Sequence, residues 1–147
     1  MIVIGCDHTA VDFKRVLIRA LSGEGYEFLD VGTDKAEACD YPDYAKKACD
    51  EILKNTGSLG ILICGTGIGI SIAANKIKGI RCALCSDAAS AAISRQHNDA
   101  NVLAMGCRVL GIETAIDIAE AFLAAEFSGE ERHIKRVEKI KSLEKNN

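Results

Sequence analysis

Proline is almost absent from this sequence, since Pro42 is the only proline among 147 residues. With 13 glycines available for turns, the chain is expected to form continuous helices and strands joined by short connections. The sequence also lacks linkers, internal repeats and low-complexity segments. These absences predict one domain over residues 1–147.

Long apolar runs and a strong charge of one sign are also missing. No stretch approaches the roughly 18 consecutive apolar residues of a transmembrane helix. The N-terminal residues lack the basic segment of a signal peptide. We therefore expect a cytoplasmic protein that binds no membrane. The net charge of −3 provides no overall field for nucleic acid, so any anion site must be built locally.

The seven cysteines follow neither a disulfide framework nor a metal-binding pattern. An odd number of irregularly spaced cysteines, in a chain without a secretory signal, indicates reduced thiols. Cys82 and Cys85 form a C-x-x-C pair, but inside a predicted strand their side chains point to opposite faces. No second Cys or His pair accompanies them, so neither zinc binding nor redox chemistry is expected there.

Strand-like and helix-like segments alternate along the chain. Short apolar strands are expected at 2–6, 26–31, 59–64, 80–85 and 102–105. Helices are expected at 10–21, 44–53, 69–76, 88–96, 114–127 and 130–145, the last one highly charged with a narrow apolar stripe that suits a partner subunit. This alternation predicts a parallel sheet covered by helices on both faces, with ligands beyond the carboxyl ends of its strands.

Cys64 stands where the third predicted strand ends and a glycine-rich turn begins. The turn, Gly65-Thr66-Gly67-Ile68-Gly69, is neither the dinucleotide-binding G-x-G-x-x-G pattern nor a phosphate loop with its Gly-Lys-Ser/Thr. Its backbone N–H groups and the positive end of the next helix favour an anion. The same surroundings can lower the pKa of a thiol. The pattern therefore predicts chemistry on an anionic substrate beside Cys64.

Histidines and arginines supply further candidates whose roles the residues alone leave open. His8 follows the first strand, and His97 ends a predicted helix; each can transfer protons or simply satisfy the backbone. Arg132 and Arg136 lie four residues apart on one helical face. They suit a phosphate, but the residues alone favour a solvated basic face or i,i+4 pairing with nearby Glu residues. Arg108, after the fifth strand, is a similar candidate.

Together these segments resemble the B-type ribose-5-phosphate isomerases, in the wider family that includes the galactose-6-phosphate isomerases of the lactose pathway. The resemblance covers nearly the whole chain and is carried by residues 5–8, 40–45, 63–76, 94–101 and 132–136. It implies a Rossmann-like three-layer α/β sandwich with a five-stranded parallel sheet and an extended C-terminal helix. It also implies a homodimer or dimer of dimers with shared sites, and neither cofactor nor metal.

The implied reaction is the interconversion of ribose 5-phosphate and ribulose 5-phosphate through an enediolate, in the pentose phosphate pathway. Cys64 matches the catalytic base, Thr66 a catalytic residue, and His97 the residue that opens the sugar ring. The implied substrate contacts are Asp7, His8, Tyr41, Gly65, Thr66, Gly67, Ile68, Gly69 and Asn98. The implied phosphate contacts are His8, Arg108, Arg132 and Arg136.

Two segments depart from the pattern of this family. Relatives have Asp-His-x-Gly-Phe where this chain has Thr9-Ala10-Val11 after Asp7-His8, and the segment before Arg132 is one residue longer. The Cys-Gly-Thr-Gly segment favours the ribose branch over the galactose branch. The alternatives are an isomerase of a six-carbon sugar phosphate, such as allose 6-phosphate, and a non-catalytic module that binds sugar phosphates or nucleotides.

Overall fold

A parallel sheet of five strands forms the centre of the molecule. The computed structural model describes residues 1–146. Its strands are β1 (Ile2–Cys6), β2 (Phe28–Asp30), β3 (Leu59–Cys64), β4 (Cys82–Leu84) and β5 (Val102–Gly106). They lie in the spatial order β2-β1-β3-β5-β4, and each neighbouring pair is parallel. The predicted α/β fold with a five-stranded parallel sheet is thus confirmed.

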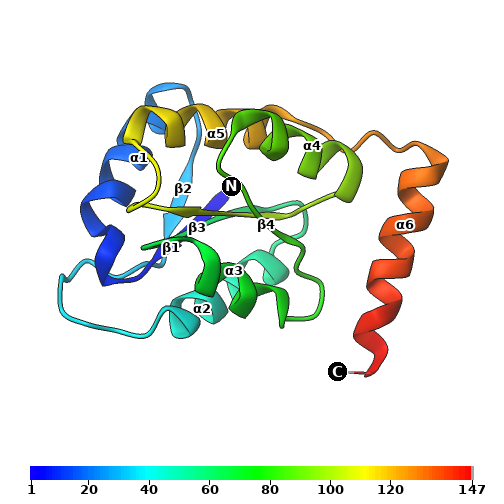
Figure 1. Cartoon of the computed structure of the whole chain (residues 1–147), viewed down its shortest axis with the longest axis horizontal. Coiled ribbons are helices and arrows are strands. Elements are labelled where there is room, and N and C mark those ends of the chain that lie inside the picture. Colours follow the sequence, from blue (N-terminus) through cyan, green and yellow to red (C-terminus); the bar gives the residue numbers. More distant parts are fainter. Residues whose placement is uncertain (147) are drawn as a thin grey trace.

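Helices cover both faces of the sheet. They are α1 (Val11–Gly23), α2 (Tyr41–Lys54), α3 (Ile68–Asn75), α4 (Ala88–Asn98), α5 (Ile112–Ala124) and α6 (Glu131–Ser142), with short 3-10 turns η1 (His8–Ala10) and η2 (Leu143–Asn146). Helices α1, α4 and α5 lie on one face, and α2 and α3 on the other (Figure 1). Among residues 1–146, no helix combines the length and apolar character needed to cross a bilayer.

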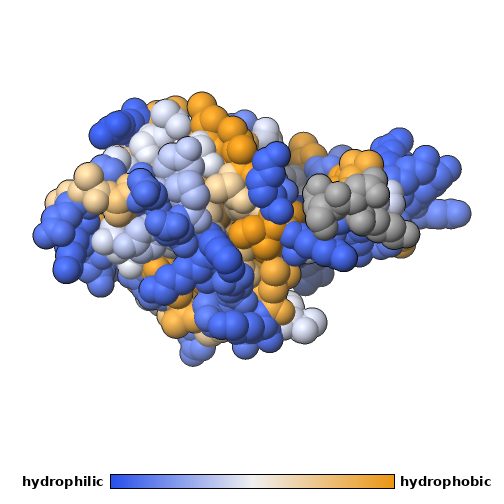
Figure 2. Space-filling view, turned by 90° about the horizontal axis from the view of Figure 1, so that it is seen from below, coloured by the Kyte–Doolittle hydropathy of each residue, from blue (hydrophilic) through white to orange (hydrophobic). Residues whose placement is uncertain are grey.

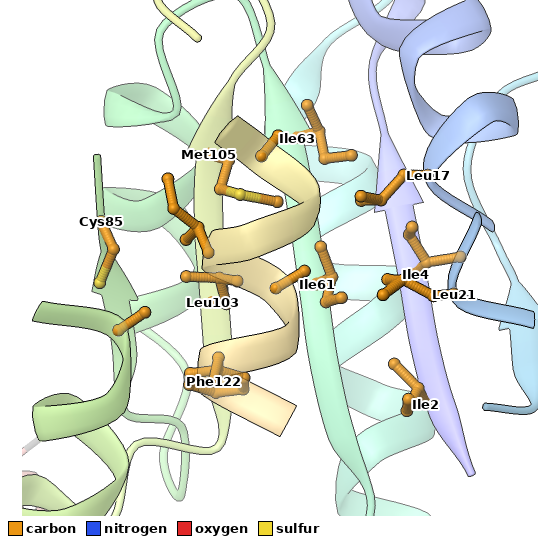
Figure 3. Packing of buried hydrophobic residues seen from close by; sticks show 14 of the residues in the cluster. Ile2, Ile4, Leu17, Leu21, Ile61, Ile63, Cys85, Leu103, Met105 and Phe122 are labelled. Atoms are coloured by element: carbon orange, nitrogen blue, oxygen red, sulfur yellow. The ribbon is translucent and has the colours of Figure 1, made fainter. Parts of the chain in front are cut away.

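Alternate residues of each strand enter two separate hydrophobic clusters. Ile4, Ile61 and Leu103 pack with α1 and α5 on one face (Figure 3), while their neighbours along the strands pack with α2 and α3. Cys85 belongs to the first cluster and Cys82 contacts the second. The prediction that these two thiols point to opposite faces is therefore confirmed.

The element boundaries differ from prediction mainly at the edges of the sheet. The predicted strands 26–31 and 80–85 shrink to three residues each, because β2 and β4 have a neighbour on one side only. The second helix begins at Tyr41 rather than near 44, since Pro42 occupies its first turn, where a missing N–H costs nothing. The last helix ends at Ser142 and continues as η2.

Helix α6 stands apart from the layered body as an arm (Figure 1). Its Val137 is buried, but Ile134, Ile140 and Leu143 of the predicted apolar stripe are 45%, 40% and 72% exposed. Seen from below, apolar side chains also form a band on the body beside this arm (Figure 2). The stripe therefore finds only part of its packing partners within the described chain.

Lys14 is a fully buried lysine that the sequence pattern did not reveal. Its ammonium group lies 2.8 Å from the carboxylate of Asp30 and 3.2 Å from that of Asp34, and it donates to the Thr33 carbonyl at 3.0 Å. Burial disfavours its charge, but the hydrogen bond and charge of Asp30 outweigh burial and raise the Lys14 pKa. Lys14 thereby ties α1 to the loop between β2 and α2.

Replacing Lys14 with methionine should destabilise the fold by about 2–3 kcal/mol, because the carbonyl and carboxylate groups around it lose their partner. Urea unfolding measures this free energy. The control is Lys46→Met, whose lysine is 69% exposed and pairs with Asp50 on the helix surface. That change should cost less than about 0.5 kcal/mol; similar costs for both variants would contradict the anchoring role of Lys14.

Candidate active site

A hollow of about 490 Å³ opens at the carboxyl edge of the sheet. Its lining residues come from the end of β3, from the segments that follow β1, β3 and β5, and from α2 and α3: Asp7, Thr9, Tyr41, Cys64, Gly65, Thr66, Ile68, Gly69, Ile72 and Arg108. This is the edge where parallel α/β sheets bind ligands. The structure therefore brings together eight of the residues that the sequence singled out: Asp7, Tyr41, Cys64, Gly65, Thr66, Ile68, Gly69 and Arg108.

Cys64 ends β3 at the floor of this hollow. Only 4% of its surface is exposed, and its Sγ accepts a hydrogen bond from the Gly67 N–H at 3.1 Å. Such a bond from backbone to sulfur strengthens when the sulfur carries negative charge. The thiol is thus oriented by the same turn that follows it.

The glycine turn is shaped by close approaches that leave no room for side chains. Gly67 has a φ of +77°, and a Cβ there would lie 2.7 Å from the backbone of Met105. A Cβ on Gly69 would lie 2.5 Å from the ring of Tyr41. The turn ends in the first residues of α3, whose N–H groups have no partners within the helix. These donors surround the space beside Cys64 and suit an anion.

The hydroxyl of Thr66 is exposed on this turn. Its Oγ1 accepts the N–H of Ile68 at 3.2 Å. Because the oxygen serves as an acceptor there, its own proton remains available for a donor role.

Asp7 and His8 follow β1 at the rim of the hollow. The Asp7 carboxylate, 5% exposed, accepts the Thr9 N–H at 3.0 Å and also the Thr9 hydroxyl. His8 Nδ1 accepts the backbone N–H of Cys39 at 3.2 Å. A neutral His8 therefore carries its proton on Nε2. Sequence reasoning missed Thr9 and Cys39, which hold these two side chains through local contacts that have no sequence signature.

Arg108 places a positive charge beside the glycine turn. Its backbone N–H donates to the Gly65 carbonyl at 2.9 Å. A Cβ on Gly65 would lie 3.4 Å from the Arg108 side chain, which is an ordinary contact distance, so the guanidinium group packs directly against the turn. Among the phosphate candidates, Arg108 lines the hollow, while His8 stands in sequence between two lining residues, Asp7 and Thr9.

His97 and Asn98 lie at the other edge of the sheet. They end α4, which runs antiparallel to the strands, and β5 starts only a few residues later. The five residues of β5 span roughly 16 Å, and Gly106 at its far end pairs with Cys64. His97 and Asn98 therefore cannot reach the hollow of their own chain.

A second cluster gathers around His97. The ring of His133 meets it edge to face, with centroids 4.1 Å apart. His133 is 2% exposed, and its Nε2 accepts from Arg132 Nε at 2.9 Å. Burial and then the neighbouring His97 and arginines lower the pKa of His133. The sequence pointed to His133 only through its place in segment 132–136, and that segment did not reveal the contact with His97.

The two arginines of α6 differ in their surroundings. Arg132 Nη1 lies 2.7 Å from the carboxylate of Glu130, two residues earlier. It thus pairs with a nearby Glu, although not at the i,i+4 spacing of the pairing alternative. Arg136 is exposed on the same helix and has no ion pair within the described part of the chain. Both lie with His97, away from the hollow.

Comparison with known proteins places the whole chain among sugar-phosphate isomerases. Residues 2–140 match the profile of the family described as Ribose/Galactose Isomerase. Ribose-5-phosphate isomerase B of Escherichia coli is 48% identical over 97% of this chain and 95% of its own length. A putative sugar phosphate isomerase of Bacillus subtilis, YwlF, is 44% identical over 99% of this chain and 98% of its own length.

Solved structures agree with the sequence comparison. Ribose-5-phosphate isomerase B of Clostridium thermocellum has a TM-score of 0.94 and 48% identity, covering 99% of this chain and 97% of that chain. Type B ribose 5-phosphate isomerase of Leishmania infantum has a TM-score of 0.94 and 44% identity, covering 99% of this chain and 96% of that chain. The agreement of the backbone therefore extends over nearly the whole chain.

The buried thiols outside the hollow should resist alkylation. Burial raises the pKa of Cys6 and Cys49 to about 12 and that of Cys85 to about 11, and it also raises the pKa of Cys82. A thiol stays protonated below its pKa, so at about pH 8 iodoacetamide should modify only the other three cysteines of the folded protein. Peptide mass spectrometry identifies the sites, and protein unfolded in urea should be modified at all seven. Rapid modification of Cys49 in the folded state would contradict this.

Proposed function

Since the chain belongs to the ribose/galactose isomerase family, we propose that it interconverts ribose 5-phosphate and ribulose 5-phosphate. The whole of residues 1–147 would act as one sugar-phosphate isomerase domain. The observation that carries the proposal is Cys64, oriented by the Gly67 N–H at 3.1 Å and facing a turn rich in backbone donors.

In this mechanism the Cys64 thiolate takes the proton from C2 of the open-chain aldose. The electron pair of the C–H bond forms the enediolate, whose negative charge develops on O1. Backbone N–H groups of 65–69 stabilise that oxygen, and the Thr66 hydroxyl donates toward it. Protonation at C1 by the Cys64 thiol then gives the ketose, and a proton moves from O2 to O1. The base is regenerated and forms no covalent bond with the sugar.

A second copy of the chain would complete the site. His97, the proposed ring-opening residue, lies at the opposite edge of its own sheet, so only a partner subunit can bring it to Cys64. Exposed apolar side chains support such an interface: Ile68 and Ile72 at the hollow are 51% and 56% exposed, and α6 offers Ile134 and Ile140. We therefore propose a homodimer, or a dimer of dimers, with sites shared between subunits.

The phosphate would be bound by positive groups from both subunits. Arg108 and His8 would come from the subunit that supplies Cys64, while Arg136 and Arg132 would come from its partner. Arg136 has no competing ion pair within residues 1–146, whereas Arg132 would have to exchange its contact with Glu130. Binding the non-reacting end in this way orients C1 and C2 at the thiol. Asp7, Tyr41 and Asn98 would contact the sugar hydroxyls.

Two alternatives remain distinguishable by experiment. A six-carbon sugar phosphate such as allose 6-phosphate requires a longer pocket. Ala10 and Val11, which depart from the family pattern, directly follow Thr9, a residue that lines the hollow. A non-catalytic binding module has no use for an oriented thiol on the floor of the hollow. A substrate comparison separates the first alternative and a Cys64 variant the second.

The purified protein should isomerise ribose 5-phosphate with a kcat/KM at least about tenfold above that for allose 6-phosphate, as measured by coupled assays. Cys64→Ala should lower kcat roughly a thousandfold, because the proton at C2 then has no base. Cys49→Ala removes another buried thiol, on α2 away from the hollow, and should retain normal turnover. Full activity of Cys64→Ala would exclude the thiol as base.

Shared sites predict complementation between two inactive variants. Cys64→Ala and His97→Asn subunits, unfolded and refolded together, form mixed dimers in which one of the two sites keeps both native residues. Random pairing should restore about a quarter of native activity on ribose 5-phosphate. Mixing Cys64→Ala with the double variant Cys64→Ala/His97→Asn should restore nothing. Activity no higher than the sum of the two parents would show that each site lies within one chain.

A further inference from the structure

Asp99 is the only residue other than glycine with a positive φ between residues 1 and 146. Its φ of 47° and ψ of 43° place it in the left-handed region directly after α4. This region crowds a side chain against the backbone, although Asp and Asn tolerate it better than most residues. Glycine would adopt it without crowding. An aspartate at this position therefore points to a use for its side chain.

The carboxylate of Asp99 is held between two arginines. Its Oδ2 accepts from Arg81 Nη2 at 2.9 Å, and its Oδ1 accepts from Arg95 Nη1 at 3.2 Å. The side chains of Arg81 and Arg95 are only 13% and 14% exposed. Charge-assisted hydrogen bonds between such groups have a better defined geometry than those of solvent-exposed pairs.

The same two arginines bind the backbone around Asp99. Arg81 donates to the Asp99 carbonyl through Nε at 2.9 Å and Nη2 at 2.7 Å, and through Nε to the Asn98 carbonyl at 3.2 Å. Arg95 Nη1 donates to the Ala100 carbonyl at 2.7 Å. Three successive carbonyl groups are therefore fixed by two guanidinium groups that Asp99 holds in place.

This fixed segment begins immediately after His97. His97 is exposed on the last turn of α4, and helix ends fray unless they are anchored. A group that transfers a proton must be held within about 0.5 Å of its productive position. Anchoring of the residues next to His97 therefore keeps the histidine in place, as proton transfer requires. A solvated, unanchored helix end would not provide this precision.

We propose that Asp99 is a positioning residue for His97, acting through Arg81 and Arg95. The three side chains hold the end of α4 so that His97 is presented to a cyclic sugar phosphate on the partner subunit. Asp99 lies at the opposite edge of the sheet from Cys64, so it does not act on the proton transfer between C2 and C1. The inference rests on the ring-opening role proposed above for His97.

The test compares two substrates that differ at a single hydroxyl, the one that closes the ring. Ribose 5-phosphate closes its ring through the C4 hydroxyl, whereas 4-deoxyribose 5-phosphate lacks this hydroxyl and stays open. Both need proton transfer at Cys64, but only the first needs ring opening. The reference variant His97→Asn should lose roughly a hundredfold in kcat/KM for ribose 5-phosphate and little for the deoxy sugar.

Asp99→Ala should show the same selectivity, with a loss of about tenfold confined to ribose 5-phosphate. Asp99→Asn tolerates the left-handed conformation and keeps one acceptor oxygen, so it should lose less, with the same selectivity. The control is Asp87→Ala, which removes the cap that accepts the Ser90 N–H at 2.7 Å at the other end of α4. It should lower the thermal midpoint but leave the ratio of the two kcat/KM values unchanged.

If His97→Asn loses activity selectively but Asp99→Ala loses equally on both substrates, or loses nothing on ribose 5-phosphate, the positioning role of Asp99 is overturned. If Asp99→Ala does not fold, the Asp99→Asn ratio decides. A His97→Asn variant without selectivity would instead overturn the ring-opening role, and the positioning role with it.

Discussion

The contact between the glycine turn and its neighbours determines the geometry of the hollow. A Cβ on Gly106 would lie 2.5 Å from the backbone of Thr66, and a Cβ on Gly67 would lie 2.7 Å from the backbone of Met105. This contact docks the turn on the end of β5, which aims the Gly67 N–H at the Cys64 sulfur. It also carries Arg108, two residues beyond Gly106, over the turn. One backbone packing therefore places the thiol, the donors and a positive charge together.

The parallel direction of the strands imposes the second constraint. Every β–α connection of such a sheet lies at the carboxyl ends of the strands, and the C-terminus of each connecting helix lies at their amino ends. Cys64 and Asp7 follow strands, whereas His97 and Asn98 end a helix, so the fold separates them within one chain. A single subunit can therefore hold the proposed base and the donors but not the proposed ring-opening residue. The proposed symmetric dimer would bring the two ends of the sheet together twice, since every contact of its interface is repeated by symmetry.

The fold could be predicted from the apolar periodicity of the sequence, because that periodicity reflects which side of each strand or helix is buried. The alternation along strands correctly separated Cys82 from Cys85, and the strand–helix order gave the parallel sheet. The short β2 and β4 were overestimated because periodicity does not distinguish an edge strand from a central one. Lys14 was missed because the periodicity of α1 shows only on which side of the helix a residue lies. Its burial depends on the loop after β2, which folds over that side of the helix.

The candidate site was predictable in part for a similar reason. Residues adjacent in sequence, such as Cys64 and its turn, stay adjacent in space, so their chemistry could be read directly. The contact of His97 with His133 joins two helices across the sequence and has no periodic signal. Arg132 and Arg136 were equivalent candidates in the sequence. Their surroundings in the structure differ, because of the two only Arg132 forms an ion pair with Glu130.

The contrast between Cys64 and the other buried thiols supports the proposal that one thiol among seven serves as the base. Cys6, Cys49, Cys82 and Cys85 belong to the two hydrophobic clusters or contact them. Burial raises the pKa of each, including Cys6, whose thiol also donates to the Thr33 carbonyl at 3.7 Å. They pack as small apolar groups, with little charge at neutral pH. Cys64 is as buried as these, but its sulfur accepts a backbone N–H and faces further donors. The same donors that stabilise charge on sulfur lie where an enediolate oxygen develops charge. In the proposed mechanism, the proton moves from carbon to sulfur while the negative charge moves from sulfur to oxygen within one set of donors, so little reorganisation of the protein is needed.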